Sequence, residues 1–362
     1  SSSLVGSMYI LDEPSIGLHS RDTKNLIKIL KQLRDIGNTV IVVEHDEEII
    51  NQSDVIIDIG PNAGKYGGEI IYNGSPKNIN KKTKGLTSNY LTNVLNIPIP
   101  KSRKNLTKKL NIFGINKHNL QNIDIEIPLN GLVLITGVSG SGKSTLVSEV
   151  IKPGIENQIN NKISRNIIYK KISFNKNDIL DVEFINQKPI GRSSRSNPVT
   201  YTKVYDDIRN LFAKLPLSKK RNYKPGFFSF NIDGGRCPNC KGEGEIKIEM
   251  QFMADVYVKC EDCHGRRFKK EVLDIKFFEK NIYEILNLSI DEAITFFKKN
   301  GENKIAYKLQ PLIDVGLKYL TLGQSSNTLS GGEAQRIKLA SFLTKSLNNK
   351  NTLFIFDEPT TG

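Results

Sequence analysis

The first 75 residues alternate between short apolar runs typical of strands and one segment with helical periodicity. Residues 8–12 (MYILD) form an apolar run that ends at an acidic pair, which favours a buried strand. Residues 22–36 are predicted to be helical, because apolar side chains recur there at helical spacing: Leu26, Ile29, Leu30 and Leu33. Residues 39–45 (TVIVVEH) are continuous and β-branched, as expected of a parallel strand buried on both faces. Such a strand–helix–strand unit places both strand ends at one edge of a sheet, and residues 54–60 and 69–73 add two short strands.

The rest of the chain continues this pattern with a long interruption. Residues 122–136 (NIDIEIPLNGLVLIT) predict two strands that lead into a glycine-rich turn and a helix over 145–151. Residues 163–236 look like an inserted helical region, and residues 204–215 (VYDDIRNLFAKL) are its clearest helix. The helices DEAITFFKK and TLSGGEAQRIKLASFLTK and the strand TLFIFDEP follow. This order predicts an α/β fold with an insertion, and excludes a sandwich or a bundle.

Length and hydropathy indicate a globular protein with room for two or three domains. The chain has 362 residues and a mean hydropathy of −0.34, enough for a sizeable core. No apolar run approaches the roughly 18 residues that span a bilayer, and nothing in the sequence predicts a secretory leader. The chain opens on SSSLVG without Met, in the middle of the apolar approach to a motif. We interpret it as a fragment of a longer protein.

The net charge of +14 is concentrated in two blocks. Residues 1–75 carry 6 basic and 11 acidic side chains, whereas residues 76–118 carry 10 basic and no acidic ones. Within the second range, residues 76–111 are Lys/Asn-rich and predict a solvated linker. Residues 152–225 carry 16 basic and 6 acidic side chains, with Arg, Tyr and Phe interleaved among short apolar periods. A folded basic face of this kind favours a polyanionic partner.

The four cysteines follow the spacing of a metal site. They form C-x₂-C-x₁₉-C-x₂-C at Cys237, Cys240, Cys260 and Cys263. Two such pairs can present four thiolates to one tetrahedral Zn²⁺, and the 19-residue span is long enough for a hairpin. Gly242 and Gly265 would relieve the turns that follow each pair. Because thiolates fill all four positions, the zinc is predicted to be structural, and the protein to occupy a reducing compartment such as the cytoplasm.

A glycine-rich stretch predicts a nucleotide site. Residues 137–145 (GVSGSGKST) match G-x-x-x-x-G-K-[ST] in full, between the predicted strand LVLIT and the predicted helix. The glycines let backbone N–H groups surround phosphates, Lys143 reaches the β and γ oxygens, and Ser144 offers its hydroxyl to Mg²⁺. The helix that follows adds its N-terminal partial charge. The residues predicted to bind nucleotide here are Gly137, Val138, Ser139, Gly140, Ser141, Gly142, Lys143, Ser144 and Thr145.

Two acidic pairs follow predicted strands in nearly the same phrase, LDEPSIGL at 11–18 and FDEPTTG at 356–362. Asp357 would hold Mg²⁺ through its water shell, and Glu358 would polarise the attacking water. Asp12 and Glu13 form an earlier acidic pair of the same kind. The repeat predicts two tandem nucleotide-binding units.

Residues 329–333 (LSGGE) resemble the signature of the ATP-binding-cassette superfamily. The resemblance implies that Ser330, Gly331 and Gly332, at a helix N-terminus, grip the γ-phosphate held by the opposite cassette. It also implies that Gln187, after the apolar run EFIN, senses Mg²⁺ and the nucleophilic water.

The same resemblance assigns a switch histidine to the first cassette. His45 closes the strand TVIVVEH, 32 residues after Glu13, which is the length that a helix and its return strand require. The matching position after Glu358 lies beyond residue 362, and no phosphate loop precedes Asp12 in the sequence. We therefore expect both ATP sites to be incomplete within these residues.

Over essentially its whole length the chain resembles the UvrA family of bacterial damage-recognition ATPases. The resemblance rests on segments that include LDEPSIGLHSRD, GNTVIVVEHDEEII, IDIGPNAGKYGGEI, ITGVSGSGKSTL, QKPIGRSSRSNPVTY, PGFFSFNIDGGRCPNC, TLSGGEAQRIKLA and FDEPTTG. It implies an ATP-binding cassette with an inserted helical signature domain and a four-cysteine zinc hairpin. It also implies ATP, Mg²⁺ and Zn²⁺ as cofactors, damaged double-stranded DNA as ligand, a homodimer, and transfer to UvrB through a region absent from this sequence.

The implied organisation divides the chain into five parts. Residues 1–75 end the first cassette, 76–111 are a basic linker, and 112–151 begin the second cassette. Residues 152–325 are the inserted DNA-facing region with the zinc module at 237–263, and 326–362 carry the signature helix and the acidic pair. The basic loops GRSSRSNP and LSKKRNYKPG supply the candidate DNA contacts Arg192, Arg195, Lys219, Lys220 and Arg221.

Three other classes share part of this pattern. The ATPase subunit of a transporter has the phosphate loop, signature and acidic pair, but needs neither the cysteines nor the basic insertion, and docks on membrane subunits that nothing in the sequence suggests. A DnaJ-type chaperone shares CPNCKGEG, but would not explain residues 137–145 or 329–333. Other DNA-handling ATPases, such as those of chromosome maintenance, lack these cysteines and have long heptad arms that are absent here.

Overall fold

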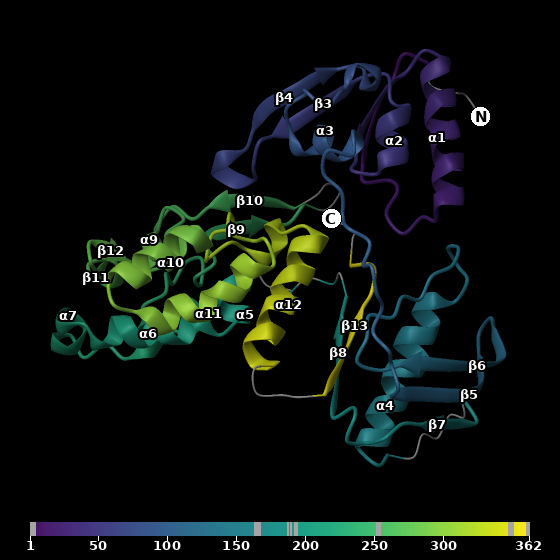
Figure 1. Cartoon of the computed structure of the whole chain (residues 1–362). Coiled ribbons are helices and arrows are strands. Elements are labelled where there is room, and N and C mark those ends of the chain that lie inside the picture. The colour runs from purple at the N-terminus through teal and green to yellow at the C-terminus, as the bar shows by residue number, and fades with distance from the viewer. Residues whose placement is uncertain are drawn as a thin grey trace. The chain divides into compact units, whose positions relative to one another are not determined.

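The computed structural model describes residues 5–162, 168–186, 188, 190–191, 195–250, 255–346 and 351–359 (Figure 1). The chain separates into two compact units. The first unit contains residues 1–184 and 350–361, and the second contains residues 185–349 with residue 362. Each unit has its own apolar core.

The N-terminal part of the first unit contains the predicted strand–helix–strand arrangement. Strand β1 (Met8–Asp12) leads through helix α1 (Ser20–Asp35) to strand β2 (Thr39–Val43), and the two strands pair in parallel with Asp12 opposite Val43. Asn38 stabilises the return to β2, because its side chain accepts a hydrogen bond from the Ser7 backbone amide and donates one to the Leu33 carbonyl. Helix α2 (Glu47–Gln52) follows.

The prediction that β2 is buried on both faces was wrong. Ile41 and Val43 are exposed, and so are Met8 and Ile10 on the neighbouring strand. The β1–β2 pair has only two strands among the described residues, and helix α1 packs against β2. The continuous apolar run therefore shows the alternation of a sheet with one solvated face.

A second pair of strands and a short helix complete this part. Two further strands form where they were predicted, β3 (Ile56–Gly60) and β4 (Glu69–Gly74). They pair in the antiparallel orientation. Helix α3 (Leu86–Leu91) lies inside the basic segment 76–111. Its Thr87 hydroxyl donates to Asp58 Oδ1 on β3 at 2.9 Å, so part of this segment is folded against the strands.

The remainder of the first unit is built around an antiparallel sheet. Its strands are β5 (Lys109–Lys117), β6 (Leu120–Pro128) and β7 (Lys171–Ser173), in the order β6-β5-β7. A π-helix (Thr145–Ile151) continues directly into helix α4 (Lys152–Ile159) and packs on this sheet. The core consists of apolar residues from these elements, among them Leu110, Ile112, Ile115, Val150, Ile151 and Ile155. Strand β8 (Asp181–Ile185) pairs with β13 (Thr352–Phe356).

The strand predicted over residues 132–136 does not form. These residues have no regular secondary structure, and Leu132 and Leu134 are 101% and 81% exposed. The apolar run is the one expected of a buried strand, but no strand among the described residues pairs with it. Without a ladder and a covered face, residues 132–136 gain neither the hydrogen bonds nor the burial that stabilise a strand.

Helices form most of the second unit. The longer ones are α6 (Val204–Lys214), α10 (Ile290–Lys299), α11 (Asn303–Asp314) and α12 (Gly331–Ser346). Helix α11 packs against α6, α10 and α12, around a core that includes Phe212, Phe228, Phe297, Leu309 and Ile337. The short helices are α5 (Pro198–Tyr201), α7 (Pro216–Lys220), α8 (Lys270–Leu273) and α9 (Ile282–Leu286).

Two small hairpins complete the second unit. Strands β9 (Glu245–Ile248) and β10 (Val256–Lys259) form one, and β11 (Lys276–Phe277) and β12 (Lys280–Asn281) form the other. None of the helices in the described part of the chain is long and apolar enough to cross a membrane.

Candidate nucleotide and zinc sites

The phosphate loop has the backbone that its glycines allow. Gly137, Gly140 and Gly142 have φ angles of 152°, 76° and 100°, a region that L-residues rarely adopt. The Lys143 ammonium donates to the carbonyls of Gly137 and Val138 at 2.8 and 2.9 Å. Ser144 stands immediately before the π-helix. The motif's single cation is thus held at the loop, beside a helix N-terminus that favours anions.

A turn of the antiparallel sheet supports this loop. Asn119, between β5 and β6, donates from Nδ2 to the Gly140 carbonyl at 3.2 Å. A Cβ at Gly142 would lie 2.8 Å from Asn119 Oδ1, so only glycine fits there without displacing Asn119. The sequence prediction missed Asn119, because the only signal in the sequence was a short polar stretch between two apolar runs. In the structure the turn is tight, and His118 before Asn119 has a φ angle of 51°.

The two acidic pairs share an unusual conformation. Glu13 and Glu358 have φ angles of 44° and 48°, both in the left-handed region. Each follows the end of a strand, β1 or β13, and precedes a proline. Non-glycine residues in this region cost on the order of 1–3 kcal/mol and concentrate at functional sites. Asp12 ends β1 and Asp357 directly follows β13, so both copies lie at the carboxyl ends of strands as predicted.

A carboxylate connects the first acidic pair to the predicted switch histidine. Glu44 Oε1 accepts from the Ser15 backbone amide at 2.9 Å, and its Oε2 accepts from the amides of His45 and Asp46 at 2.9 and 3.1 Å. Burial would raise the pKa of Glu44, but a hydrogen bond from the Ser15 side chain and those from the three backbone amides outweigh it and hold the pKa below its usual value. Glu44 therefore fixes the end of β2 against the loop that follows Glu13.

The signature segment begins helix α12 through a reciprocal cap. The Glu333 amide donates to Ser330 Oγ at 3.2 Å, and the Ser330 amide donates to Glu333 Oε2 at 2.9 Å. The Tyr319 hydroxyl donates to Glu333 Oε1 at 2.6 Å. Burial and this contact raise the pKa of Tyr319 to about 12. Ser330, Gly331 and Gly332 thus lie at a fixed helix N-terminus, and Tyr319 is a support that the motif did not reveal.

The four cysteines form one buried cluster. Cys237 and Cys260 have their Sγ atoms 3.9 Å apart, Cys240 and Cys263 3.6 Å apart, and all four lie within 4.8 Å of one another. A tetrahedral Zn²⁺ with bonds of about 2.3 Å requires S···S edges of roughly 3.8 Å. The donor set and its dimensions therefore fit zinc, with every coordination position taken by sulfur.

The turns of this cluster need left-handed residues. Lys241 and Gly242 after the first pair, and His264 and Gly265 after the second, all have positive φ angles between 49° and 84°. A Cβ at Gly242 would lie 2.2 Å from the Phe230 carbonyl oxygen. The Gly244 amide also donates to Cys240 Sγ at 3.2 Å, a contact that favours a thiolate.

The predicted DNA-contact residues differ in their surroundings. Lys219 and Lys220 end helix α7 and are exposed. Arg221 donates to the Glu271 carbonyl at 2.8 Å and pairs with Asp274 at 3.3 Å. Arg195 lies 3.8 Å from Glu243 of the zinc module. Arg192 and the predicted catalytic Gln187 lie outside the described residues.

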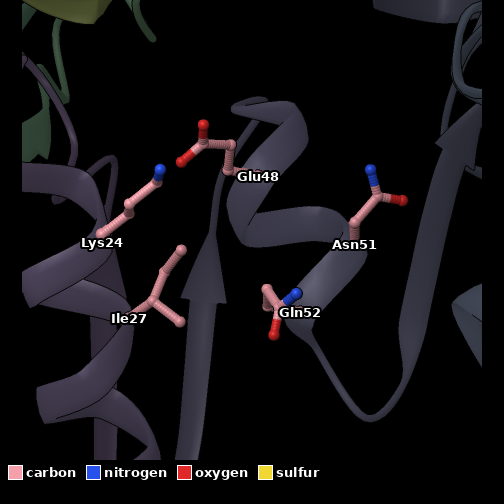
Figure 2. Close-up of a pocket in the computed structure, with 5 residues that line it drawn as sticks. All are labelled: Lys24, Ile27, Glu48, Asn51 and Gln52. Atoms are coloured by element: carbon pink, nitrogen blue, oxygen red, sulfur yellow. The ribbon is translucent and has the colours of Figure 1, made fainter. Parts of the chain in front are cut away.

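A pocket of about 420 Å³ lies elsewhere, between α1 and α2 (Figure 2). Its lining residues are Lys24, Ile27, Glu48, Asn51 and Gln52. None of them belongs to a predicted site, and the pocket is not part of the candidate nucleotide or zinc sites.

Comparison with known proteins agrees with the motifs. No protein-family model matches the chain. UvrABC system protein A of Clostridium tetani is 53% identical over 362 residues, and that of Lactococcus lactis subsp. lactis is 52% identical over 363 residues. Each alignment covers 100% of this chain and 38% of the relative, so the chain spans well under half the length of these relatives.

A solved structure gives the same result for the fold. The crystal structure of UvrA2 from Deinococcus radiodurans matches with a TM-score of 0.92 and 43% sequence identity, over 100% of this chain and 43% of that one. This match confirms the predicted fold class, an α/β ATP-binding cassette with an inserted helical region and a four-cysteine hairpin.

Proposed function

Because the chain resembles UvrABC system protein A along its whole length, we propose that it is part of an ATPase that recognises damaged DNA in nucleotide excision repair. The observation that carries the proposal lies in the second unit, where a capped LSGGE helix and a four-thiol cluster occur together. A transporter ATPase needs the helix but not the cluster, and a zinc-dependent chaperone needs the cluster but not the helix.

Each ATP site would combine groups from two cassettes. The phosphate loop, with Lys143 and Ser144, binds the phosphates of one site, and the opposite cassette supplies a signature serine. Ser330 would be the signature serine that this cassette supplies to the second ATP site. Glu358 and Glu13 orient the attacking water in their respective sites, and His45 and Gln187 position it with them. Ser144, and Asp357 through water, would hold Mg²⁺, which would neutralise charge on the β- and γ-phosphates.

The zinc module would have a structural role. Four thiolates leave no position for a substrate or a reactive water. The cluster instead fixes the base of the β9–β10 hairpin, since its two cysteine pairs flank the two strands. Arg195 beside Glu243 couples one basic loop to this module.

Contacts to DNA would come mainly from phosphate recognition by the basic surface, with Arg192, Arg195, Lys219 and Lys220 as candidates. Arg221 remains a candidate, although two of its contacts are made within the unit. The functional protein would be a cytoplasmic homodimer. It would transfer damaged DNA to UvrB through a region outside these residues.

Filter binding of the complete protein tests this proposal. We expect it to retain lesion-bearing duplex more strongly than undamaged duplex, with ATP changing the ratio and retention falling steeply with salt. A Lys143→Ala variant, which lacks the phosphate-loop cation of one of the two sites, should weaken the response to ATP and keep the salt dependence. Failure to retain either DNA at low salt would favour the alternative, the ATPase subunit of a transporter. Equal retention of both duplexes would favour another DNA-handling ATP-binding-cassette protein.

A further inference from the structure

One arginine of the zinc module has a backbone conformation that arginine rarely adopts. Arg267 follows the second cysteine pair and has a φ angle of 69°. Glycine fits this left-handed region without strain, whereas a residue with a Cβ does not. The Arg267 carbonyl accepts a hydrogen bond from the Cys237 amide at 2.9 Å, but any residue could supply that carbonyl. The side chain therefore has to account for an arginine at this position.

The stem of the Arg267 side chain lies against Gly244, beside the first cysteine pair. A Cβ at Gly244 would lie only 3.2 Å from Arg267 Cγ. The Gly244 amide donates to Cys240 Sγ at 3.2 Å, and its carbonyl accepts from the Cys260 amide at 2.9 Å. Arg267 thus packs on the residue that connects one cysteine of the first pair to one of the second.

The guanidinium group of Arg267 is buried at one end without a polar partner. Its Cζ lies 5.6 Å from the ring centroid of Phe230, which is fully buried. Its Nη1 is buried and has no hydrogen-bond partner among the described residues. Burial of an unpaired charged donor is costly, and contact with one aromatic face compensates only part of that cost. A negative charge nearby would offset the rest.

The four cysteines would supply this negative charge when they bind zinc. Four thiolates around one Zn²⁺ form a doubly negative complex, and charges attract one another more strongly in the protein interior than in water. Burial has the largest influence on the pKa of Arg267 and lowers it, whereas attraction to groups that include Tyr205, Glu245 and Cys240 raises it. Zinc binding keeps the thiolates ionised, which should strengthen the attraction to Cys240.

We propose that Arg267 is a charge-compensating residue of the zinc site, which stabilises the four-thiolate complex from the side of Cys240. The guanidinium offsets the negative charge of the complex, and the stem holds Gly244 where its amide donates to Cys240. The inference rests on the assignment of zinc to the four cysteines and is independent of the proposed function. It accounts for an arginine at a position where glycine would be less strained.

The zinc affinity of the complete protein tests the inference. Arg267→Met keeps an apolar stem and removes the charge. We expect it to raise the zinc Kd of this site about tenfold, since loss of a group that supports the metal ligands costs roughly 10–100-fold in affinity. Arg267→Lys should recover most of the loss. Competition with a chromogenic chelator measures the Kd, and the zinc that a Cys240→Ser variant lacks identifies the metal of this site.

Comparison of the zinc-bound and zinc-free proteins separates charge compensation from packing. Arg267→Met should lower the midpoint of the thermal transition that zinc stabilises, and should change that midpoint less after zinc has been removed. An equal loss in both states would show a merely structural role and overturn the inference. An unchanged zinc Kd, or a Kd raised as much by Arg267→Lys as by Arg267→Met, would overturn it as well. Equal zinc content in the wild type and Cys240→Ser would instead contradict the zinc assignment.

Arg209 on α6 is a matched control in the same unit. Its Cζ also lies 5.6 Å from an aromatic centroid, that of Tyr205, and its Nε is also buried without a hydrogen bond. Its charge, however, is paired with Asp206. Arg209→Met should therefore leave the zinc Kd within about twofold of wild type. A rise as large as that for Arg267→Met would contradict a specific role for Arg267.

A second variant covers the case in which Arg267→Met does not fold. Arg267→Gly removes the side chain and suits the left-handed backbone of this position. We expect it to raise the zinc Kd by about tenfold or more, because both the charge and the stem are lost. A zinc Kd equal to that of the wild type would overturn the inference.

Discussion

At the residue scale, the two acidic pairs are distinguished by their backbone as much as by their charge. Glu13 and Glu358 are separated by almost the whole chain, yet both adopt a left-handed conformation that differs by only a few degrees. The left-handed backbone orients the side chain differently from that of an extended residue at the same position. The repeated strain supports the interpretation that both pairs perform the same task.

Glu44 gives a prediction about pH. Its pKa is lowered in the folded protein, so its hydrogen bonds contribute stability above the unfolded-state pKa of about 4.3, and this contribution is lost as the pH falls through the folded-state pKa. We expect Glu44→Gln to lower the urea midpoint of the complete protein at pH 6–7, and the difference from wild type to shrink below about pH 4.

Comparing the two proteins at each pH removes the contribution of the other carboxylates, which both share. Urea titrations followed by circular dichroism would measure the difference. A difference that stays constant from pH 7 to pH 3 would contradict the assignment.

The same residues show what the sequence could predict at this scale. Lys143, Ser330 and the four cysteines were found because their neighbours in sequence define them. Asn119 and Tyr319 were missed because their partners, Gly140 and Glu333, lie 21 and 14 residues away. A lone tyrosine or asparagine carries no local pattern, and only the fold brings it to Glu333 or Gly140.

At the element scale, strands were harder to predict than helices. Helices α6, α10 and α12 formed within the segments that the sequence predicted to be helical, because a helix makes its hydrogen bonds within itself. Residues 132–136 have an equally strong apolar pattern but lack a partner strand. Strand β5 was missed, since its residues fall partly within a Lys/Asn-rich block, although Leu110, Ile112 and Ile115 are fully buried there.

The zinc hairpin gives a prediction for an element that depends on its ligands. We expect one zinc per chain by atomic absorption, and Cys240→Ser to lose most of that metal and to lower the thermal midpoint, because metal binding contributes directly to folding. Cys240→Ala should behave in the same way, whereas Ser75→Ala, a change in the other unit, should keep the metal. Full metal content and an unchanged midpoint in Cys240→Ser would contradict the site.

At the scale of the whole molecule, the chemistry is divided between two units with separate cores. The phosphate loop and both acidic pairs lie in the first unit, whereas the signature helix and the cysteine cluster lie in the second. The sequence predicted each motif, but the unit boundary at residue 184 falls inside a region that showed only a helical insertion. Where one core ends depends on long-range packing, which a local pattern does not contain.

The basic surface gives a prediction at this scale. Replacing Lys219 and Lys220 with alanine should weaken DNA binding and reduce the slope of log K against log salt by about 1.8, the value for two phosphate contacts of about 0.9 each. Lys298 and Lys299 provide a matched control, since they also end a helix and are exposed. Fluorescence anisotropy across a salt series measures both pairs. Equal slopes for the Lys219/Lys220 variant and the wild type would place the DNA elsewhere.

The solvent-facing leucines of residues 132–136 have a practical consequence. Leu132 and Leu134 are largely exposed in an apolar stretch without regular secondary structure, and an exposed apolar segment of this kind favours self-association through strand pairing. The apparent molecular mass of this polypeptide, measured by light scattering, should therefore rise with its concentration. Lysine at position 134 should suppress that aggregation, which would make a Leu134→Lys chain the better starting material for biophysical work.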